Sequence, residues 1–151
     1  NTVKGESMIR QLRQNDIPSV LKLMDLVKDD FAGYKEVEFL ESLMQAIAHN
    51  EAIIDKRGED CAGLISFSKL ENELTFLAVH PNYRKQGLSK KLINECLAQF
   101  KKGEEIHVIT FREGDTKGIA ARKCYFSCGF EEAETLTVFG YPCQKMTKKV
   151  A

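Results

Sequence analysis

The chain has 151 residues, of which 43% are hydrophobic and 29% are charged, which is enough for one globular domain with its own core. Its 22 basic residues balance its 22 acidic ones, so no overall field favours nucleic acid or an anionic membrane as a partner. No apolar run approaches the roughly 20 residues that a membrane-spanning helix needs.

Residues 1–7 are polar and precede a candidate initiator, Met8. We therefore expect them to be a non-native remnant or a disordered extension, followed by a single domain over residues 8–151. Five cysteines with no zinc-site spacing, and no secretory apolar region ahead of them, favour a reduced cytoplasmic setting without a bound metal.

The first half of the chain predicts strands around two helices. Residues 8–12 form the first strand, and a helix follows because Asn15 or Asp16 is a suitable cap and Pro18 fits its first turn. An acidic connection leads to a second helix over residues 36–50, whose inward face should carry Val37, Leu40, Leu43, Met44 and Ile47.

Three short apolar segments then predict an antiparallel meander of strands, at residues 51–56, 61–70 and 73–79. The remaining pattern predicts a helix, a strand, a helix and two closing strands, at residues 88–100, 105–111, 116–127, 131–140 and 144–150. The closing strands offer an edge for a homodimer, although a buried sheet face explains the same apolar residues.

The most informative segment begins at the strand over residues 73–79, which ends at Pro81, and continues through a basic turn into an amphipathic helix. A helix start presents unpaired N–H groups and a partial positive charge, which together suit phosphate oxygens. Gly87 lets the backbone come close to such an anion, while Arg84 and Lys85 add positive charge and Ser89 adds a hydroxyl.

Two patterns resemble landmarks of the Gcn5-related N-acetyltransferase (GNAT) superfamily. The R-x-x-G-x-S turn at Arg84, Gly87 and Ser89 resembles motif A, with a serine where a smaller residue is usual. The later A-x-x-x-Y-x-x-x-G-F pattern, from Ala121 to Phe130, resembles the second landmark of this family. The resemblance covers nearly the whole chain from Met8 onward, in the order of its elements as well as in its motifs.

This resemblance implies a mixed α/β (α+β) fold, in which a mostly antiparallel sheet of about seven strands is flanked by about four helices. It also implies an N-acetyltransferase that uses acetyl-CoA, without a metal, and moves the acetyl group directly to a primary amine of a small molecule or protein. The cofactor-binding residues that it implies are Leu77 and Val79 for the pantetheine arm, and Arg84, Lys85, Gln86, Gly87, Leu88 and Ser89 for the pyrophosphate.

Removing a proton from an alkyl ammonium, whose pKa is about 10, requires a base in the site. Glu73 is the first candidate, because it begins the strand that leads to the phosphate turn, and family members often have a catalytic glutamate at this point. Strand alternation places Glu73 with Thr75, Leu77 and Val79, opposite Leu74, Phe76 and Ala78. An exposed carboxylate at a strand start is the competing interpretation.

In the family, the tyrosine of the second pattern, here Tyr125, directs its hydroxyl at the coenzyme A sulfur and acts as general acid. A buried tyrosine that anchors its helix is the alternative. Family members often carry an asparagine where this chain has Gly118, so Arg112 or Thr116 would have to supply that polar contact. The three histidines have no serine or carboxylate partner at a recognisable spacing, so we expect them to be structural.

Two questions of function stay open at the level of sequence. Carboxylates between residues 25 and 41 favour a cationic acceptor such as a polyamine, an amino sugar or a lysine side chain, but a solvated helix surface explains them too. A non-catalytic acyl-CoA-binding sensor or interaction module is the alternative to an enzyme. A nucleotide-binding regulator is disfavoured, because the phosphate-loop lysine and its following serine or threonine are absent.

Overall fold

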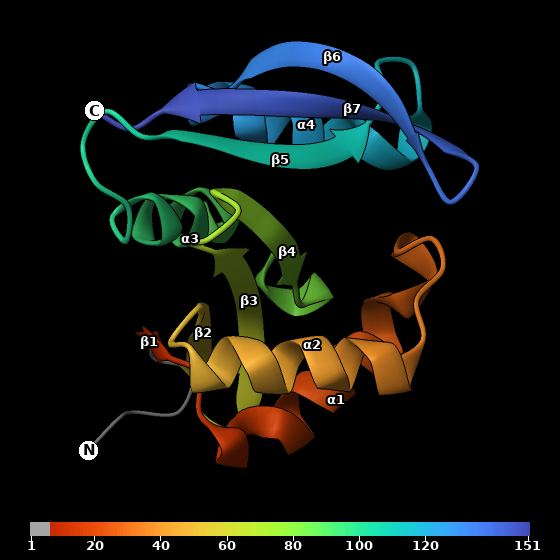
Figure 1. Ribbon diagram of the computed structural model, residues 1–151. Helices are drawn as coiled ribbons and strands as arrows, with labels where there is room; N and C mark the ends of the chain where they lie inside the picture. Colours follow the sequence, from red (N-terminus) through yellow and green to blue (C-terminus); the bar gives the residue numbers. More distant parts are fainter. Residues whose placement is uncertain (1–6) are drawn as a thin grey trace.

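Seven strands form one open sheet, in the order β1-β2-β3-β4-β5-β7-β6, in the computed structural model, which describes residues 7–151 (Figure 1). The strands are β1 (Met8–Gln11), β2 (Ala52–Arg57), β3 (Asp60–Ser68), β4 (Glu73–Val79), β5 (Glu105–Phe111), β6 (Glu131–Val138) and β7 (Tyr141–Lys149). Neighbouring strands are antiparallel except β4 and β5, which run parallel. This arrangement confirms the predicted meander and the mixed, mostly antiparallel sheet.

Four α-helices within the described residues cover the two faces of this sheet: α1 (Ile17–Val27), α2 (Glu36–Ala48), α3 (Leu88–Leu97) and α4 (Ile119–Ser127). The helices α1 and α2 pack on one face, and α3 and α4 pack on the other. Within residues 7–151, none of these helices is long and apolar enough to cross a membrane.

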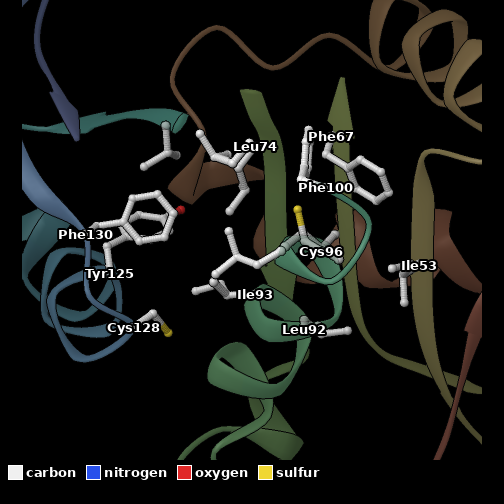
Figure 2. Close-up of a cluster of buried hydrophobic side chains, with 14 of the residues drawn as sticks. Ile53, Phe67, Leu74, Leu92, Ile93, Cys96, Phe100, Tyr125, Cys128 and Phe130 are labelled. Carbon is white, nitrogen blue, oxygen red and sulfur yellow. The ribbon is translucent and has the colours of Figure 1, made fainter. Parts of the chain in front are cut away.

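The core on the α3 face joins both halves of the sheet (Figure 2). Leu92, Ile93 and Cys96 of α3 are fully buried against strand residues that include Phe67 and Leu74. Burying a leucine or isoleucine side chain contributes roughly 1.5–3 kcal/mol to stability. The apolar stripe predicted for this helix therefore fixes α3 on the sheet and holds its N-terminus at the end of β4.

The core on the other face holds Val20, Leu23, Met24 and Val27 of α1, which are buried, and it corrects the stripe predicted for α2. Leu43 is buried as predicted, whereas Val37 and Met44 are 69% and 40% exposed. The buried stripe of α2 instead begins at Phe39, whose ring lies 5.2 Å from that of Phe76 in β4. Ile47 packs on this core as predicted, and the contact between Phe39 and Phe76 leaves no sign in a helical pattern.

A bulge in β4 corrects the predicted alternation of that strand. Phe67 of β3 pairs with Leu74 and the neighbouring Ser66 pairs with Phe76, so Thr75 is an extra residue. Leu74 consequently packs in the α3 core while Phe76 packs in the α1 and α2 core, although alternation predicts one face for both. Glu73 precedes Leu74 and points to the α2 face, away from the face of Leu77.

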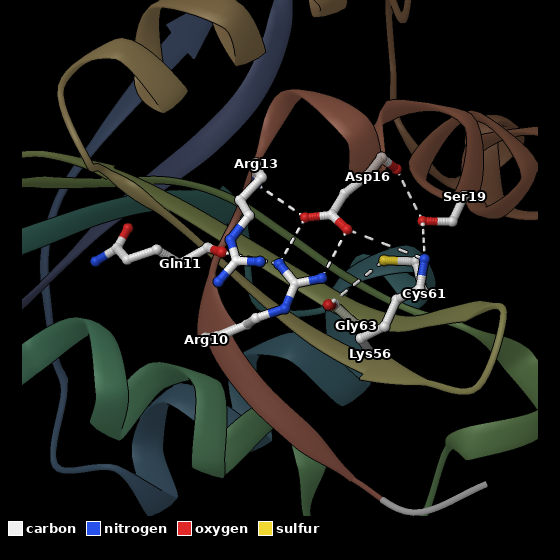
Figure 3. A network of polar contacts seen from close by, with 8 residues as sticks. All are labelled: Arg10, Gln11, Arg13, Asp16, Ser19, Lys56, Cys61 and Gly63. Carbon is white, nitrogen blue, oxygen red and sulfur yellow. Dashed lines mark hydrogen bonds and ion pairs between the residues drawn. The ribbon is translucent and has the colours of Figure 1, made fainter. Parts of the chain in front are cut away.

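A buried ion pair anchors the start of α1 to β1 (Figure 3). The side chain of Asp16, only 3% exposed, accepts hydrogen bonds from Arg10 at 2.7 and 2.8 Å and from the Arg13 N–H at 2.8 Å. Burial acts to raise the pKa of Asp16, but these hydrogen bonds outweigh it and hold the pKa below its usual value.

The predicted N-terminal extension lies outside the described residues except for Ser7. Its hydroxyl donates a hydrogen bond to Asp55 at 2.9 Å. The boundary of the domain at residue 8 therefore stays a prediction.

Candidate active site

The turn between β4 and α3 has the backbone geometry of an anion site. Gly87, the residue that caps α3, has a φ of +75°, a left-handed conformation that glycine adopts without strain. The first helical hydrogen bond runs from the Lys91 N–H to the Gly87 carbonyl, so the N–H groups of residues 88–90 have no partner within the helix. A Cβ at Gly87 would meet no atom within 4 Å, which leaves the backbone open to a ligand.

The side chains of this turn have different surroundings. Arg84 donates from Nε to the Val79 carbonyl at 3.3 Å and pairs with Asp30 at 3.6 Å, which holds its charge over the end of β4. Gln86 accepts a hydrogen bond from Arg57 at 2.9 Å and so ties the turn to the β2–β3 hairpin. Lys85 is exposed, and Leu88 is buried beneath the helix start.

The strands β4 and β5 separate immediately after they meet. Only Glu73 with His107 and Leu74 with Val108 are register partners, although each strand has seven residues. Beyond the bulge, β4 continues to pair with β3. The β5-facing backbone edge of β4 from Leu77 to Val79 thus has no partner in the β5 ladder.

A cavity of about 640 Å³ opens where these strands separate. Six parts of the chain line it: β4, β5, α4, the β6–β7 hairpin, the connection from α1 to α2, and the first turn of α2 at Glu38. Two sequence-predicted site residues, Leu77 and Tyr125, lie on its wall, and the lining of β4 begins one residue after Glu73. The phosphate turn lies at the far end of β4, so a ligand that spans both would run along this strand.

Tyr125 combines burial with access to the cavity. It is 5% exposed, its ring lies 5.6 Å from that of Phe130, and its hydroxyl points toward Leu74 (Figure 2). No hydrogen bond to this hydroxyl is found within residues 7–151, which leaves it available to a ligand. Burial raises the pKa of Tyr125, so the phenol stays protonated at neutral pH.

Glu73 and His107 face each other at the point where β4 and β5 part. Their side chains, 27% and 23% exposed, approach to 3.8 Å between Oε1 and Nε2. The sequence predicts a structural role for His107, because no carboxylate stands at a recognisable spacing from it; the parallel register of β4 and β5 brings Glu73 to it. Neither side chain lines the cavity, but each immediately precedes a lining residue, Leu74 in β4 and Val108 in β5.

The start of α4 explains the missing asparagine. A Cβ on Gly118 would lie 2.4 Å from the Cβ of Phe111, so no side chain fits there. Arg112, one of two proposed substitutes, donates instead to the carbonyl groups of Cys143 at 3.0 Å and Leu136 at 3.2 Å. It holds the β6–β7 hairpin against β5.

The carboxylates between residues 25 and 41 are mostly outside the cavity. Among the described residues only Glu38 of this group lines it, together with the oppositely charged Lys35. Asp30 instead pairs with Arg84. In the part of the chain that the structure describes, no cluster of three or more histidine, cysteine, aspartate or glutamate side chains could hold a metal ion.

Comparisons with known proteins agree with this geometry. Residues 20–130 match the model of the acetyltransferase (GNAT) family. No curated protein sequence matches the chain significantly. Many solved structures share its fold at low identity, among them the following three.

The first is Naa50 of Arabidopsis thaliana, in complex with the bisubstrate analogue CoA-Ac-MVNAL, with a TM-score of 0.71, 19% identity and coverage of 95% of this chain and 98% of that chain. The second is yncA of Salmonella typhimurium with its cofactor acetyl-CoA, with a TM-score of 0.74, 14% identity and coverage of 97% of this chain and 95% of that chain. The third is the ribosomal-protein-S18-alanine N-acetyltransferase of Escherichia coli, with a TM-score of 0.72, 17% identity and coverage of 97% of this chain and 95% of that chain.

Proposed function

The chain belongs to the acetyltransferase (GNAT) family, and from that premise we propose that its cavity between β4 and β5 is where a primary amine of a small molecule or peptide receives the acetyl group. The chain is an acetyl-CoA-dependent N-acetyltransferase. The observation that carries the proposal is the continuity of the site: β4 links the anion turn, the free strand edge and the cavity wall at Tyr125.

The residues present suit coenzyme A. The unpaired N–H groups of residues 88–90, with Arg84 and Lys85 beside them, would hold the pyrophosphate, which approaches over Gly87. The main-chain groups of Leu77 and the N–H of Val79, which have no partner in β5, would pair with the amides of the pantetheine arm, whereas the Val79 carbonyl accepts from Arg84. When bound, acetyl-CoA supplies an activated acetyl thioester.

Tyr125 acts as the general acid in this proposal. Its buried phenol keeps its proton at neutral pH, faces the cavity and donates that proton from its oxygen to the departing sulfur. Phe130 packs on the ring and fixes its direction.

Glu73 acts as the base that removes a proton from the acceptor ammonium, directly or through water. His107, 3.8 Å away, is close enough to take up the proton in turn through small side-chain movements or a bridging water. The position of the pair, one residue before the cavity-lining segments of β4 and β5 and on the sheet face opposite α3, supports this role.

A thermal-shift titration tests the cofactor, and Tyr125→Phe tests the chemistry. At about 100 times its dissociation constant, acetyl-CoA should raise the free energy of unfolding by about 2.7 kcal/mol, whereas ATP and NADH should change it little. Tyr125→Phe should keep this shift and lose about 10²–10⁴-fold in kcat, while Tyr34→Phe, which changes a tyrosine outside the cavity wall, should keep its activity. Unchanged turnover in Tyr125→Phe would refute the general acid.

The base is tested in the same way. Glu73→Gln and His107→Gln should each lower kcat about 10²-fold or more without changing the acetyl-CoA shift, and Glu71→Gln is the matched control at an exposed neighbouring carboxylate. A wild-type protein that binds acetyl-CoA but acetylates no amine would instead support the non-catalytic acyl-CoA-binding module.

A further inference from the structure

The tip of the β6–β7 hairpin breaks the usual chemistry of its turn. Val138 pairs with Tyr141, so the loop between them has two residues, Phe139 and Gly140. Their φ angles of +50° and +78° define a left-handed turn, in which Asn-Gly is strongly preferred and a bulky first residue is strained. Phe139 is also fully exposed, so burial does not compensate for this strain.

Phe139 lies at the mouth of the cavity. It lines the cavity from one side, while Phe31 and Gly33 of the connection between α1 and α2 line it from another. Figure 1 shows the hairpin tip extending on the same side of the molecule as that connection. Because the ring of Phe139 is exposed at the entrance of the cavity, it is positioned to contact an acceptor that enters.

The cavity wall beyond this ring is apolar with balanced charge. Aromatic and aliphatic side chains from the sheet continue inward from Phe139, among them Phe76, Ile109 and Phe111. Lys35 and Glu38 contribute one charge of each sign. Most of the wall is therefore apolar, and burying a second ammonium group of the acceptor against these side chains would be costly.

We propose that Phe139 is a specificity-determining residue that covers an apolar or aromatic group next to the acceptor amine. The inference rests on the proposed function and narrows its acceptor. It favours a primary amine with an apolar substituent, whether a small amine or a peptide with an apolar N-terminal residue, over a polyamine, an amino sugar or a lysine side chain.

Phe139→Asn tests this proposal without a risk of unfolding, because it creates the preferred Asn-Gly turn. We expect the melting temperature to rise by about 2–4 °C. At the same time kcat/KM for 2-phenylethylamine should fall about tenfold. Most of the change should be a higher KM, because the lost apolar contact stabilises the bound amine and the transition state equally. Leu70→Asn is the control, since Leu70 is 91% exposed at the β3–β4 turn and does not line the cavity.

The amine panel separates this inference from the proposed function. Wild-type kcat/KM should be higher for 2-phenylethylamine and 3-methylbutylamine, or for a Leu-initiated over a Gly-initiated peptide, than for spermidine, glucosamine and Nα-acetyl-lysine. Comparing the two small apolar amines with the Leu-initiated peptide distinguishes a small-amine acceptor from a peptide acceptor. Acetylation led by spermidine, or a Phe139→Asn variant with an unchanged preference, would refute the inference alone, and no acetylation of any amine would refute the proposed function as well.

Discussion

Replacing Asp16 by asparagine should remove much of the anchor between β1 and α1. The carboxylate is 3% exposed and accepts three hydrogen bonds, two from Arg10 and one from the Arg13 N–H. Removing one partner of a buried ion pair costs about 3–5 kcal/mol, because the remaining charge loses its compensation. Arg10 keeps 22% side-chain exposure, so we expect about 3 kcal/mol, the lower end of this range.

The pH dependence of stability gives a second measure of the same contact. The folded pKa of Asp16 lies below its unfolded value, so its stabilisation is present above about pH 4 and is lost as the pH falls through the folded pKa. Urea unfolding of the wild type should show this decrease in the free energy of unfolding at low pH. In Asp16→Asn, the share of the decrease that comes from protonation of Asp16 should be absent. Asp25→Asn, at a 72% exposed carboxylate of the same helix, should change stability by less than about 0.5 kcal/mol. Equal stability of Asp16→Asn and wild type at pH 7 would refute the reasoning.

Three further predictions concern the site. Gly118→Asn, which restores the residue usual in the family, should destabilise the protein by about 1–3 kcal/mol in urea unfolding, since its Cβ would collide with Phe111; wild-type stability would show that the helix start shifts freely. Gly87→Ala should cost about 1–2 kcal/mol and weaken acetyl-CoA binding in calorimetry, because alanine is strained at this left-handed position; unchanged affinity would argue against the anion turn. Burial raises the pKa of the Cys96 thiol to about 12 and that of Cys124 to about 11, so iodoacetamide should label both at least roughly 100-fold more slowly at pH 7.5 than an ordinary thiol, and fast native labelling followed by mass spectrometry would contradict this.

Local sequence was sufficient for most of the fold. Apolar periodicity located the strands and helices to within a few residues, because a helix or strand must present its apolar side chains on one face. The phosphate turn was equally visible, since a glycine in a left-handed conformation and an apolar helix behind it are both local features. Tyr125 was identified by a pattern along one helix, which the structure places on the cavity wall.

Properties that depend on side-chain fit across the sheet were not visible. Val37 and Met44 of the α2 stripe were predicted wrongly, whereas Leu43 and Ile47 were placed correctly, and Phe39 packs on Phe76 of a distant strand. The faces of β4 changed because Thr75 forms a bulge opposite β3, a matter of register between two strands. Neither contact leaves a periodic signal within one element.

The sequence by itself determined the order of elements, the family resemblance and the place of the anion turn, all of which rest on neighbours in the chain. Only the tertiary structure brought His107 to Glu73 through the parallel register of β4 and β5. It alone placed Phe139 at the cavity mouth and most of the acidic side chains outside it. The physical reason is that catalysis and recognition depend on distances between side chains from different elements, and these distances are set when the two cores pack against the sheet.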